Sequence, residues 1–197
     1  MATSFDTMEN IILENDRIRL RPLIADDYNN LLPIAMRNPS MLQFSPQQVN
    51  TEDKLLAYIE KAITQRQEGS RYPFISFDKK AQEYSGSTSY LNISNSNERL
   101  EIGATWLGTD FQGTGLNKEQ KRLMLTYAFE TIGMKRVELK TDGRNLQSQK
   151  ALLKIGAKQE GILRSHTIME DGFRRDTVYF SILSDEWQTV KKELFGE

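Results

Sequence analysis

The sequence predicts a single mixed α/β domain, and two patterns carry that prediction. Between residues 72 and 107, apolar and polar side chains alternate in three consecutive segments joined by polar turns, which is typical of an antiparallel meander. A glycine-rich turn at residues 111–117 then joins the last segment to a long amphipathic stretch. Strand and helix patterns alternate to the end of the chain, so the predicted order is β, α, α, β, β, β, α, β, α, β, β, α.

The first third of the chain contains one predicted strand and two predicted helices. Residues 17–22 alternate like a strand that a proline ends. A helix is predicted for residues 25–36, with Asp26 and Asp27 suited to its first turn, and a second helix for residues 51–69. Both helices therefore precede the meander.

The loop between these helices, residues 37–46, carries several apolar side chains that look exposed. They are Met41, Leu42 and Phe44. One interpretation is a small satellite of the hydrophobic core, and the other is the lip of a binding site, since loops often carry function. The sequence leaves both open.

The meander strands are predicted at residues 72–78, 83–93 and 99–107, and the helix after the glycine turn at residues 116–132. Apolar side chains at helical spacing predict its buried stripe: Leu116, Leu123, Met124, Tyr127 and Ala128. Four charged side chains are expected to stay in water: Lys118, Glu119, Lys121 and Arg122.

The last third alternates again between strand and helix patterns. We expect a strand at residues 137–141 and a short helix at residues 145–155, which a glycine stops. A hairpin of residues 158–169 and 175–183 follows, and residues 185–195 are predicted to be helical.

Length and charge limit the function classes. The 197 residues fit one domain spanning 1–197, with residues 1–16 as a polar N-terminal extension, and the formal charge is −1. That charge argues against a nucleic-acid partner held by a broad basic field. An apolar run of membrane-spanning length and a signal peptide are both missing, so we expect a cytoplasmic protein with no membrane partner.

The chain has no cysteine and a single histidine, His166. This composition excludes disulfides, thiolate zinc sites and a cysteine acyl-enzyme, and it makes a histidine metal cluster or a serine–histidine couple improbable. We therefore expect no metal. The chemistry has to use carboxylates, hydroxyls, amides and the backbone.

The turn between the third meander strand and the long helix is the main candidate site. The first N–H groups of a helix have no intrahelical partner and lie at the positive end of its dipole, so they hold an anion such as a phosphate. Glycines let a ligand approach that backbone closely. An ordinary strand-to-helix turn is the alternative. The residues concerned are Gln112, Gly113, Thr114, Gly115, Leu116 and Asn117.

These residues, in this order of elements, resemble the GNAT superfamily of acyl-CoA-dependent N-acyltransferases, whose signature is Gln/Arg-x-x-Gly-x-Gly/Ala. Gln112 and Gly115 match the signature, whereas Asn117 stands in the last place, where a side chain replaces glycine or alanine near the pyrophosphate. Further segments at residues 101–108, 136–142 and elsewhere look like the branch that contains the ribosomal-protein alanine and serine N-acetyltransferases. The resemblance covers roughly residues 15–188.

The resemblance implies a GNAT-like fold, a mixed and mostly antiparallel sheet flanked by helices, with acetyl-CoA as co-substrate. In the family, pantetheine pairs like an added strand with the strand before the phosphate turn, here with backbone groups of Trp106 and Leu107. One such N–H is suited to polarising the thioester carbonyl. Asn145 is either a helix cap or, as the resemblance implies, a contact to the CoA arm, and both roles are compatible.

Acetyl transfer to an amine also needs a proton for the departing thiolate. Ser148 is the candidate donor, because it shares the apolar face of its predicted helix with Leu152 and Ile155. Alternatively its hydroxyl bonds a nearby backbone group. Tyr179 is a fallback acid that we expect on the opposite sheet face from Val178 and Phe180.

The general base is less sharply indicated. Glu101, near the start of its strand, could take a proton from the acceptor ammonium through water, or it could simply pair with a basic side chain. His166 is expected at the surface. Three further carboxylates are candidates: Glu138, Asp142 and Asp176, the last of which is expected to pair with Arg175.

We therefore interpret the chain as an acetyl-CoA-dependent N-acetyltransferase that acts on a primary amine, of a small molecule or of a protein N-terminus, by direct transfer in a ternary complex. The competing hypothesis is a non-catalytic module that binds or senses acyl-CoA, since motifs alone fix function weakly. The sequence identifies neither the acceptor nor the oligomeric state, and a homodimer stays open.

Overall fold

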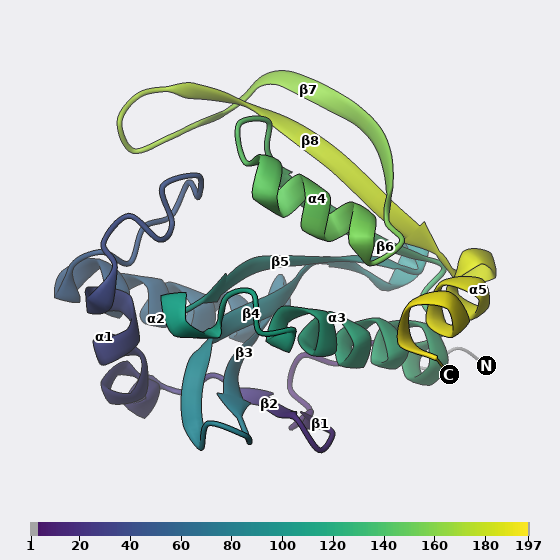
Figure 1. Ribbon diagram of the computed structural model, residues 1–197, viewed down its shortest axis with the longest axis horizontal. Helices are drawn as coiled ribbons and strands as arrows, with labels where there is room; N and C mark the ends of the chain where they lie inside the picture. The colour runs from purple at the N-terminus through teal and green to yellow at the C-terminus, as the bar shows by residue number, and fades with distance from the viewer. Residues whose placement is uncertain (1–3, 197) are drawn as a thin grey trace.

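The computed structural model describes residues 4–196 (Figure 1), and within them one sheet is flanked by helices. The strands are β1 (Leu13–Glu14), β2 (Ile18–Pro22), β3 (Arg71–Asp78), β4 (Glu83–Ser94), β5 (Arg99–Leu107), β6 (Arg136–Asp142), β7 (Lys158–Ile168) and β8 (Arg174–Leu183). The helices are α1 (Tyr28–Arg37), α2 (Glu52–Gln67), α3 (Leu116–Thr126), α4 (Leu146–Lys154) and α5 (Ser184–Phe195). A π-helical segment, η4 (Tyr127–Ile132), continues α3, and the short 3-10 turns are η1 (Ala25–Asp27), η2 (Asn95–Asn97) and η3 (Thr109–Phe111).

The sheet runs in the order β1-β2-β3-β4-β5-β6-β8-β7. Every neighbouring pair is antiparallel except β5 and β6, which are parallel. The predicted meander is therefore β3-β4-β5, and the prediction of a mixed, mostly antiparallel sheet is confirmed. No helix within residues 4–196 is both long enough and apolar enough to cross a membrane.

The two faces of the sheet carry separate hydrophobic clusters. On one face α3, α4 and α5 pack over a cluster that includes Leu139 and Phe180, and on the other α1 and α2 pack over Ile75 and Trp106. Because side chains alternate along a strand, Leu107 lies in the first cluster although its neighbour Trp106 lies in the second. Residues that follow one another along β5 thus face opposite sides of the sheet.

Two parts of the chain differ from the sequence-based expectation. The segment that shows no pattern before β2 contributes Phe5 and Ile11 to the core and forms the short strand β1. Lys121 was expected to stay in water, but that prediction is wrong, because its side chain lies under α3 and only 4% of the residue is exposed. Gln120 of α3 is buried as well, so the buried face of this helix is wider than its apolar stripe.

The feature that positions the site is the divergence of β5 from β6. The two strands pair only from Arg99 opposite Arg136 to Glu101 opposite Glu138. Beyond this point the register of β5 with β4 also shifts, and Ala104 takes a φ of 47°, as expected of a β-bulge, which bends its strand. In Figure 1, β6, β8 and β7 rise away from β5, with α4 above β5 and α3 below it. Beyond Glu101, one edge of β5 is therefore left without a neighbouring strand among residues 4–196.

Candidate active site

The glycine turn between β5 and α3 has the geometry of an anion site. Gly113 and Gly115 have φ values of 73° and 86°, and a Cβ built on either would meet no atom within 4 Å, so the backbone here faces open space. Among residues 4–196, no protein acceptor receives the backbone N–H of Gly113, Thr114 or Gly115. These donors, at the positive end of the α3 dipole, suit a phosphate.

Side chains of the turn hold it against β5. The amide Nε2 of Gln112 donates to the Leu107 carbonyl at 3.0 Å, and the hydroxyl of Thr114 donates to the Phe111 carbonyl at 2.8 Å. The turn also accommodates Asn117, the departure from the family signature. Its Oδ1 is buried and has no partner within the described residues, which leaves a polar group that a ligand could satisfy.

The uncovered edge of β5 leads from the divergence to this turn. The N–H of Gly108 donates to the Ser85 carbonyl of β4 at 2.9 Å, so by alternation the N–H of Leu107 faces the other, uncovered edge. Trp106 instead pairs with Ser87 of β4. Of the two residues predicted to lie along pantetheine, Leu107 therefore presents its backbone to the open edge, whereas the backbone of Trp106 faces β4.

Helix α4 borders the same divergence and contains Ser148. Asn145 caps the helix, since its Oδ1 accepts a hydrogen bond from the N–H of Ser148 at 3.0 Å. The half-buried Ser148 lies on the helix face of the buried Leu152 and Ile155. Among the residues described, none bonds the hydroxyl of Ser148, so the alternative in which this hydroxyl bonds the backbone is not observed. The hydroxyl is free to donate to a ligand.

We expect Asn145→Ala to destabilise the protein by about 1 kcal/mol, because it removes the side chain that satisfies an otherwise unpaired N–H of the first turn. Differential scanning calorimetry measures this effect. A variant with the stability of the parent protein would show that the cap contributes nothing and that Asn145 serves only as a ligand contact.

Glu101 and Lys140 form an ion pair where β5 and β6 separate. The Nζ of Lys140 lies 2.7 Å from Oε2 of Glu101, which also accepts a hydrogen bond from Nδ2 of Asn92 at 2.7 Å. Glu101 is only 6% exposed. Burial alone would lower the pKa of Lys140, but the hydrogen bond and charge of Glu101 outweigh burial, and the pKa of Lys140 is raised. The pairing that the sequence left as the alternative for Glu101 is thus present.

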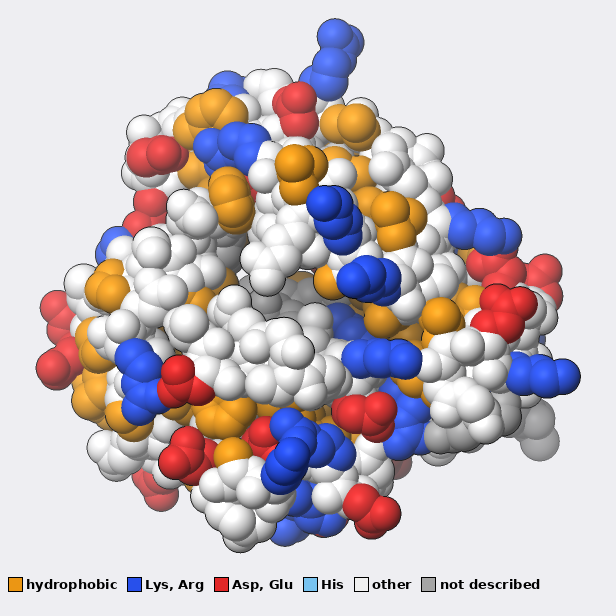
Figure 2. All heavy atoms as spheres, viewed as in Figure 1, with side chains coloured by type: hydrophobic (Ala, Val, Ile, Leu, Met, Phe, Trp, Pro, Cys, Tyr) orange, Lys and Arg blue, Asp and Glu red, His pale blue; other side chains and the backbone are white. Residues whose placement is uncertain are grey.

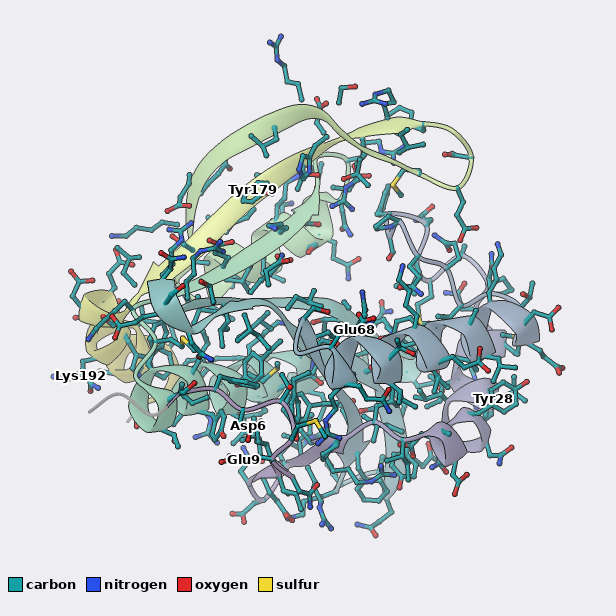
Figure 3. The ribbon with its side chains drawn as sticks, turned by 180° about the vertical axis from the view of Figure 1, so that it is seen from behind. Asp6, Glu9, Tyr28, Glu68, Tyr179 and Lys192 are labelled. Carbon is teal, nitrogen blue, oxygen red and sulfur yellow. The ribbon has the colours of Figure 1, made fainter. Side chains whose placement is uncertain are left out.

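Tyr179 of β8, labelled in Figure 3, lies beside Lys140 of this ion pair. Lys140 Nζ lies 4.7 Å from the centroid of the Tyr179 ring, and the His166 ring packs edge-on against Tyr179 with centroids 5.9 Å apart. Tyr179 is on the sheet face opposite the buried Val178 and Phe180, as expected. His166 is exposed, and its Nδ1 lies 3.0 Å from Oγ1 of Thr177.

The other candidate carboxylates have structural partners. Glu138 accepts hydrogen bonds from two arginines, Arg99 and Arg136, and Asp142 pairs with Arg144 at 2.7 Å. The expected pair of Asp176 with Arg175 is wrong, because Asp176 accepts from the backbone N–H of Ser165 at 2.6 Å. Neighbours along a strand point to opposite faces, and this separates the two side chains.

Arg175 instead reaches across to the loop between α1 and α2. Its Nη1 donates to the Phe44 carbonyl at 3.1 Å. Lys54, at the start of α2, pairs with Glu170 of the β7–β8 turn at 2.6 Å. We call this meeting of residues 37–48 with residues 169–175 the mouth. Met41 and Leu42 of the loop pack against the core cluster of α1 and α2, as the satellite interpretation expects. The contact with Arg175 in the far half of the protein fits the lip interpretation as well.

The surface agrees with a site at the divergence. Figure 2 shows a hollow near the middle of the face, between the part that carries α4 and the part that carries α3, with Lys and Arg side chains gathered at its edge. Basic side chains around a hollow suit a polyanionic ligand. The glycine turn and the open edge of β5 supply the remaining donors of such a site.

Comparison with known proteins gives one family. Residues 17–158 match the model of the "Acetyltransferase (GNAT) domain". The Bacillus subtilis (strain 168) protein named "Putative ribosomal N-acetyltransferase YdaF" is 33% identical over 106 residues, which make up 54% of this chain. That alignment spans 57% of the length of YdaF, somewhat more than half.

Two further matches cover more of the chain. The ribosomal-protein-serine acetyltransferase of Escherichia coli (strain K12) is 24% identical over 182 residues, with 91% of this chain and 100% of that protein aligned. The crystal structure of a GCN5-related N-acetyltransferase from Brucella melitensis superimposes with a TM-score of 0.89 at 24% identity, covering 100% of this chain and 88% of that chain. The second match shows that the fold is shared.

Proposed function

Because this chain belongs to the GNAT acetyltransferase family, we propose that it transfers an acetyl group from acetyl-CoA to a primary amine, directly within a ternary complex. The observation that carries the proposal is the uncovered edge of β5, which runs from the ion pair at Glu101 to the glycine turn. It offers strand-like backbone groups next to an anion site, and an acyl-CoA needs both.

On this proposal each part of the site has one task. Free N–H groups of Gly113, Thr114 and Gly115 hold the pyrophosphate, and the N–H of Leu107 donates to the thioester carbonyl as negative charge develops on it. Acetyl-CoA supplies the activated acyl group. Since the chain has no cysteine, an acyl-enzyme on sulfur is excluded, and the amine attacks the thioester itself.

Deprotonation of the amine is assigned to Glu101, through water. Its carboxylate lies 2.7 Å from Nζ of Lys140, at the point where the acceptor side of the sheet meets the open edge. Tyr179 and Lys140 line that side beside it. A base within reach of the amine, by way of one water, meets the geometric requirement for proton transfer.

We propose an exposed protein or peptide N-terminus as the acceptor. Relatives named for ribosomal N-acetyltransferase and ribosomal-protein-serine acetyltransferase activity support this class. The mouth supports it too. The Cζ of Arg144 lies 3.8 Å from the centroid of the Phe173 ring and 5.6 Å from that of the Phe44 ring, so cationic and aromatic side chains that could contact an extended chain end gather there.

An acceptor screen tests this function. Purified protein is incubated with acetyl-CoA and, in separate reactions, with polyamines, aminoglycosides, amino acids and peptides with free N-termini, and the release of free thiol is followed. We expect thiol release above spontaneous hydrolysis with N-terminal peptides. If acetyl-CoA binds but no amine increases thiol release, the protein is a binding or sensing module instead.

Ser148 is assigned the hydrogen bond to the departing thiolate, and Ser148→Ala should lower turnover by about ten- to a thousandfold. Acetyl-CoA affinity should hardly change, because the bond strengthens mainly in the transition state. Alanine is also the better helix former, so α4 is retained. Gln147→Ala, an exposed neighbour on the same turn, is the matched control. Steady-state turnover equal to that of the control would reduce Ser148 to a packing residue.

A further inference from the structure

Lys121 is a buried amine to which the proposed acetyl transfer assigns no role. It lies on α3 facing β5, and its Nζ donates to Oγ1 of Thr105 at 2.8 Å. That oxygen is in turn 2.8 Å from Oγ1 of Thr88 on β4. Within residues 4–196 no carboxylate lies within ion-pair distance of Lys121, although burying an unpaired charge is costly. An apolar side chain would pack here without that cost, so the presence of a lysine at this buried position needs a functional explanation.

Lys121 lies beside the path that an acyl-CoA arm would take along β5. Thr105 belongs to the part of β5 beyond the divergence, two residues before Leu107, whose N–H faces the open edge. Lys121 also lies one turn into the helix whose N-terminus forms the anion site. An acyl-CoA arm that runs from that turn along β5 would pass beside Thr105 and hence beside the Nζ that Thr105 holds.

The sheet separates this amine from the proposed base. Leu100 and Ile102 point into the cluster under α3, so Glu101 between them points to the opposite face, as do Lys140 and Tyr179. The acceptor and its base therefore occupy one face, whereas α3 and α4 bring Lys121 and Ser148 from the other. A departing thiolate remains on the side from which the CoA arm enters, which is the side of Lys121.

We propose that Lys121 is a further catalytic residue, whose Nζ turns from Thr105 to the sulfur of the bound thioester and gives it a proton as the carbon–sulfur bond breaks. This proposal rests on the proposed acetyltransferase function. The acceptor nitrogen forms the new bond to the carbonyl carbon, the electron pair of the carbon–sulfur bond goes to sulfur, and the Lys121 proton completes the free thiol. The acceptor proton leaves through Glu101, and Lys121 is reprotonated from water as the products depart.

The environment of Lys121 suits an acid for a thiolate. Burial lowers the pKa of Lys121 to about 7, against a smaller opposing effect of the Glu101 charge. An ammonium of that acidity can pass its proton to an alkyl thiolate, whose conjugate acid has a pKa of about 8.5, whereas a serine hydroxyl can only share one. Ser148 and Lys121 thus have complementary tasks.

Few other charges act on this amine. Glu101 is the titratable group of β5 that does so, and Lys140 of β6 pairs with that carboxylate. β4 contributes hydroxyls, those of Thr88 and Tyr90, and the burial of Tyr90 raises its pKa well above its usual value. Lys118 and Arg122, on α3 itself, are neighbouring charges.

The test compares Lys121→Met and Lys121→Arg with the parent protein, using the best peptide of the acceptor screen. Lys121→Met should lower kcat by about a hundredfold or more, with the dissociation constant for acetyl-CoA changed by less than about threefold because the donor acts in the transition state. In the parent protein kcat should fall as the pH rises through about 7, because the acid is lost. Lys121→Arg stays charged, so its kcat should show no such fall.

Two further variants complete the test. Lys192→Met removes an exposed positive charge on α5, far from Tyr179 in Figure 3, and should keep the kcat of the parent protein. Thr105→Val removes the hydroxyl that accepts the Nζ hydrogen bond, together with its contact to Thr88. The charged form of Lys121 then loses a partner, so the fall in kcat should move to lower pH. This variant gives a result even if Lys121→Met does not fold.

The outcomes separate the two claims. An unchanged kcat in Lys121→Met, or pH profiles of the parent, Lys121→Arg and Thr105→Val that coincide, overturns the role of Lys121 and leaves the acetyltransferase function standing. No turnover in the parent protein with any amine, despite acetyl-CoA binding, overturns both.

Discussion

Gly115→Glu is expected to abolish acetyl-CoA binding in a protein that still folds. Gly115 directly precedes α3, and its N–H is one of the three donors of the turn that no described residue satisfies. A glutamate side chain there would enter the open space in front of these donors and place a negative charge where a phosphate has to lie. Isothermal titration calorimetry should show heat with the parent protein and none with the variant.

The conformation of Gly115 requires a matched control, because a side chain at a φ of 86° is strained even where it has room. Gly196→Glu provides it. Gly196 has a φ of 72°, and a Cβ built there also meets nothing within 4 Å. Gly196 follows α5 and is not part of the glycine turn before α3. We expect Gly196→Glu to bind acetyl-CoA normally. A folded Gly115→Glu protein with parental affinity would remove the turn from the binding site.

Glu101→Gln is expected to lower turnover by about a hundred- to ten-thousandfold, which is the usual contribution of a general base. The loss should be largest at pH values where the acceptor amine is mainly protonated, and calorimetry should find acetyl-CoA binding intact. The glutamine keeps the shape and can still bond Asn92. The substitution also removes the charge that raises the pKa of Lys140, so burial should then lower that pKa.

Glu160→Gln is the control for the loss of one ion-paired carboxylate. The Arg136 hydrogen bonds lower the pKa of Glu160 to about 2, so Glu160 is ionised at every pH of the assay, and we expect no change in turnover. A pH–rate profile of Glu101→Gln parallel to that of the parent protein would assign deprotonation to water or to another carboxylate.

Local features of the chain were predictable because local chemistry determines them. Thr51 caps α2 by accepting the N–H of Lys54, and Asn145 caps α4. The period-two alternation identified β3, β4 and β5, and the glycines identified the turn, since few residue types adopt such φ values. The boundary at η1 shows the limit of this approach, because Asp26 and Asp27 open a 3-10 turn before α1 rather than the α-helix itself.

Contacts between distant segments could not be predicted in the same way. Lys121 occupies a position that looks exposed from its own helix, and only the packing of α3 against β5 buries it. The ion pair of Glu101 with Lys140 depends on the register of the parallel pair β5–β6. The hydrogen bond from Arg175 to the Phe44 carbonyl joins residues 131 positions apart in sequence. Hydrophobic periodicity describes only neighbouring residues, so it cannot predict such a contact.

Direct transfer requires that the amine receives the acetyl group that the thioester loses. A peptide with a free N-terminal amine and an internal lysine is incubated with acetyl-CoA and the protein, and thiol release is measured alongside the mass and site of each acetyl group. We predict one thiol for each acetyl group, all acetyl on the α-amino group, and neither product with Gly115→Glu. Thiol released without acetylated peptide, or acetylation that persists in the folded Gly115→Glu variant, would contradict the account.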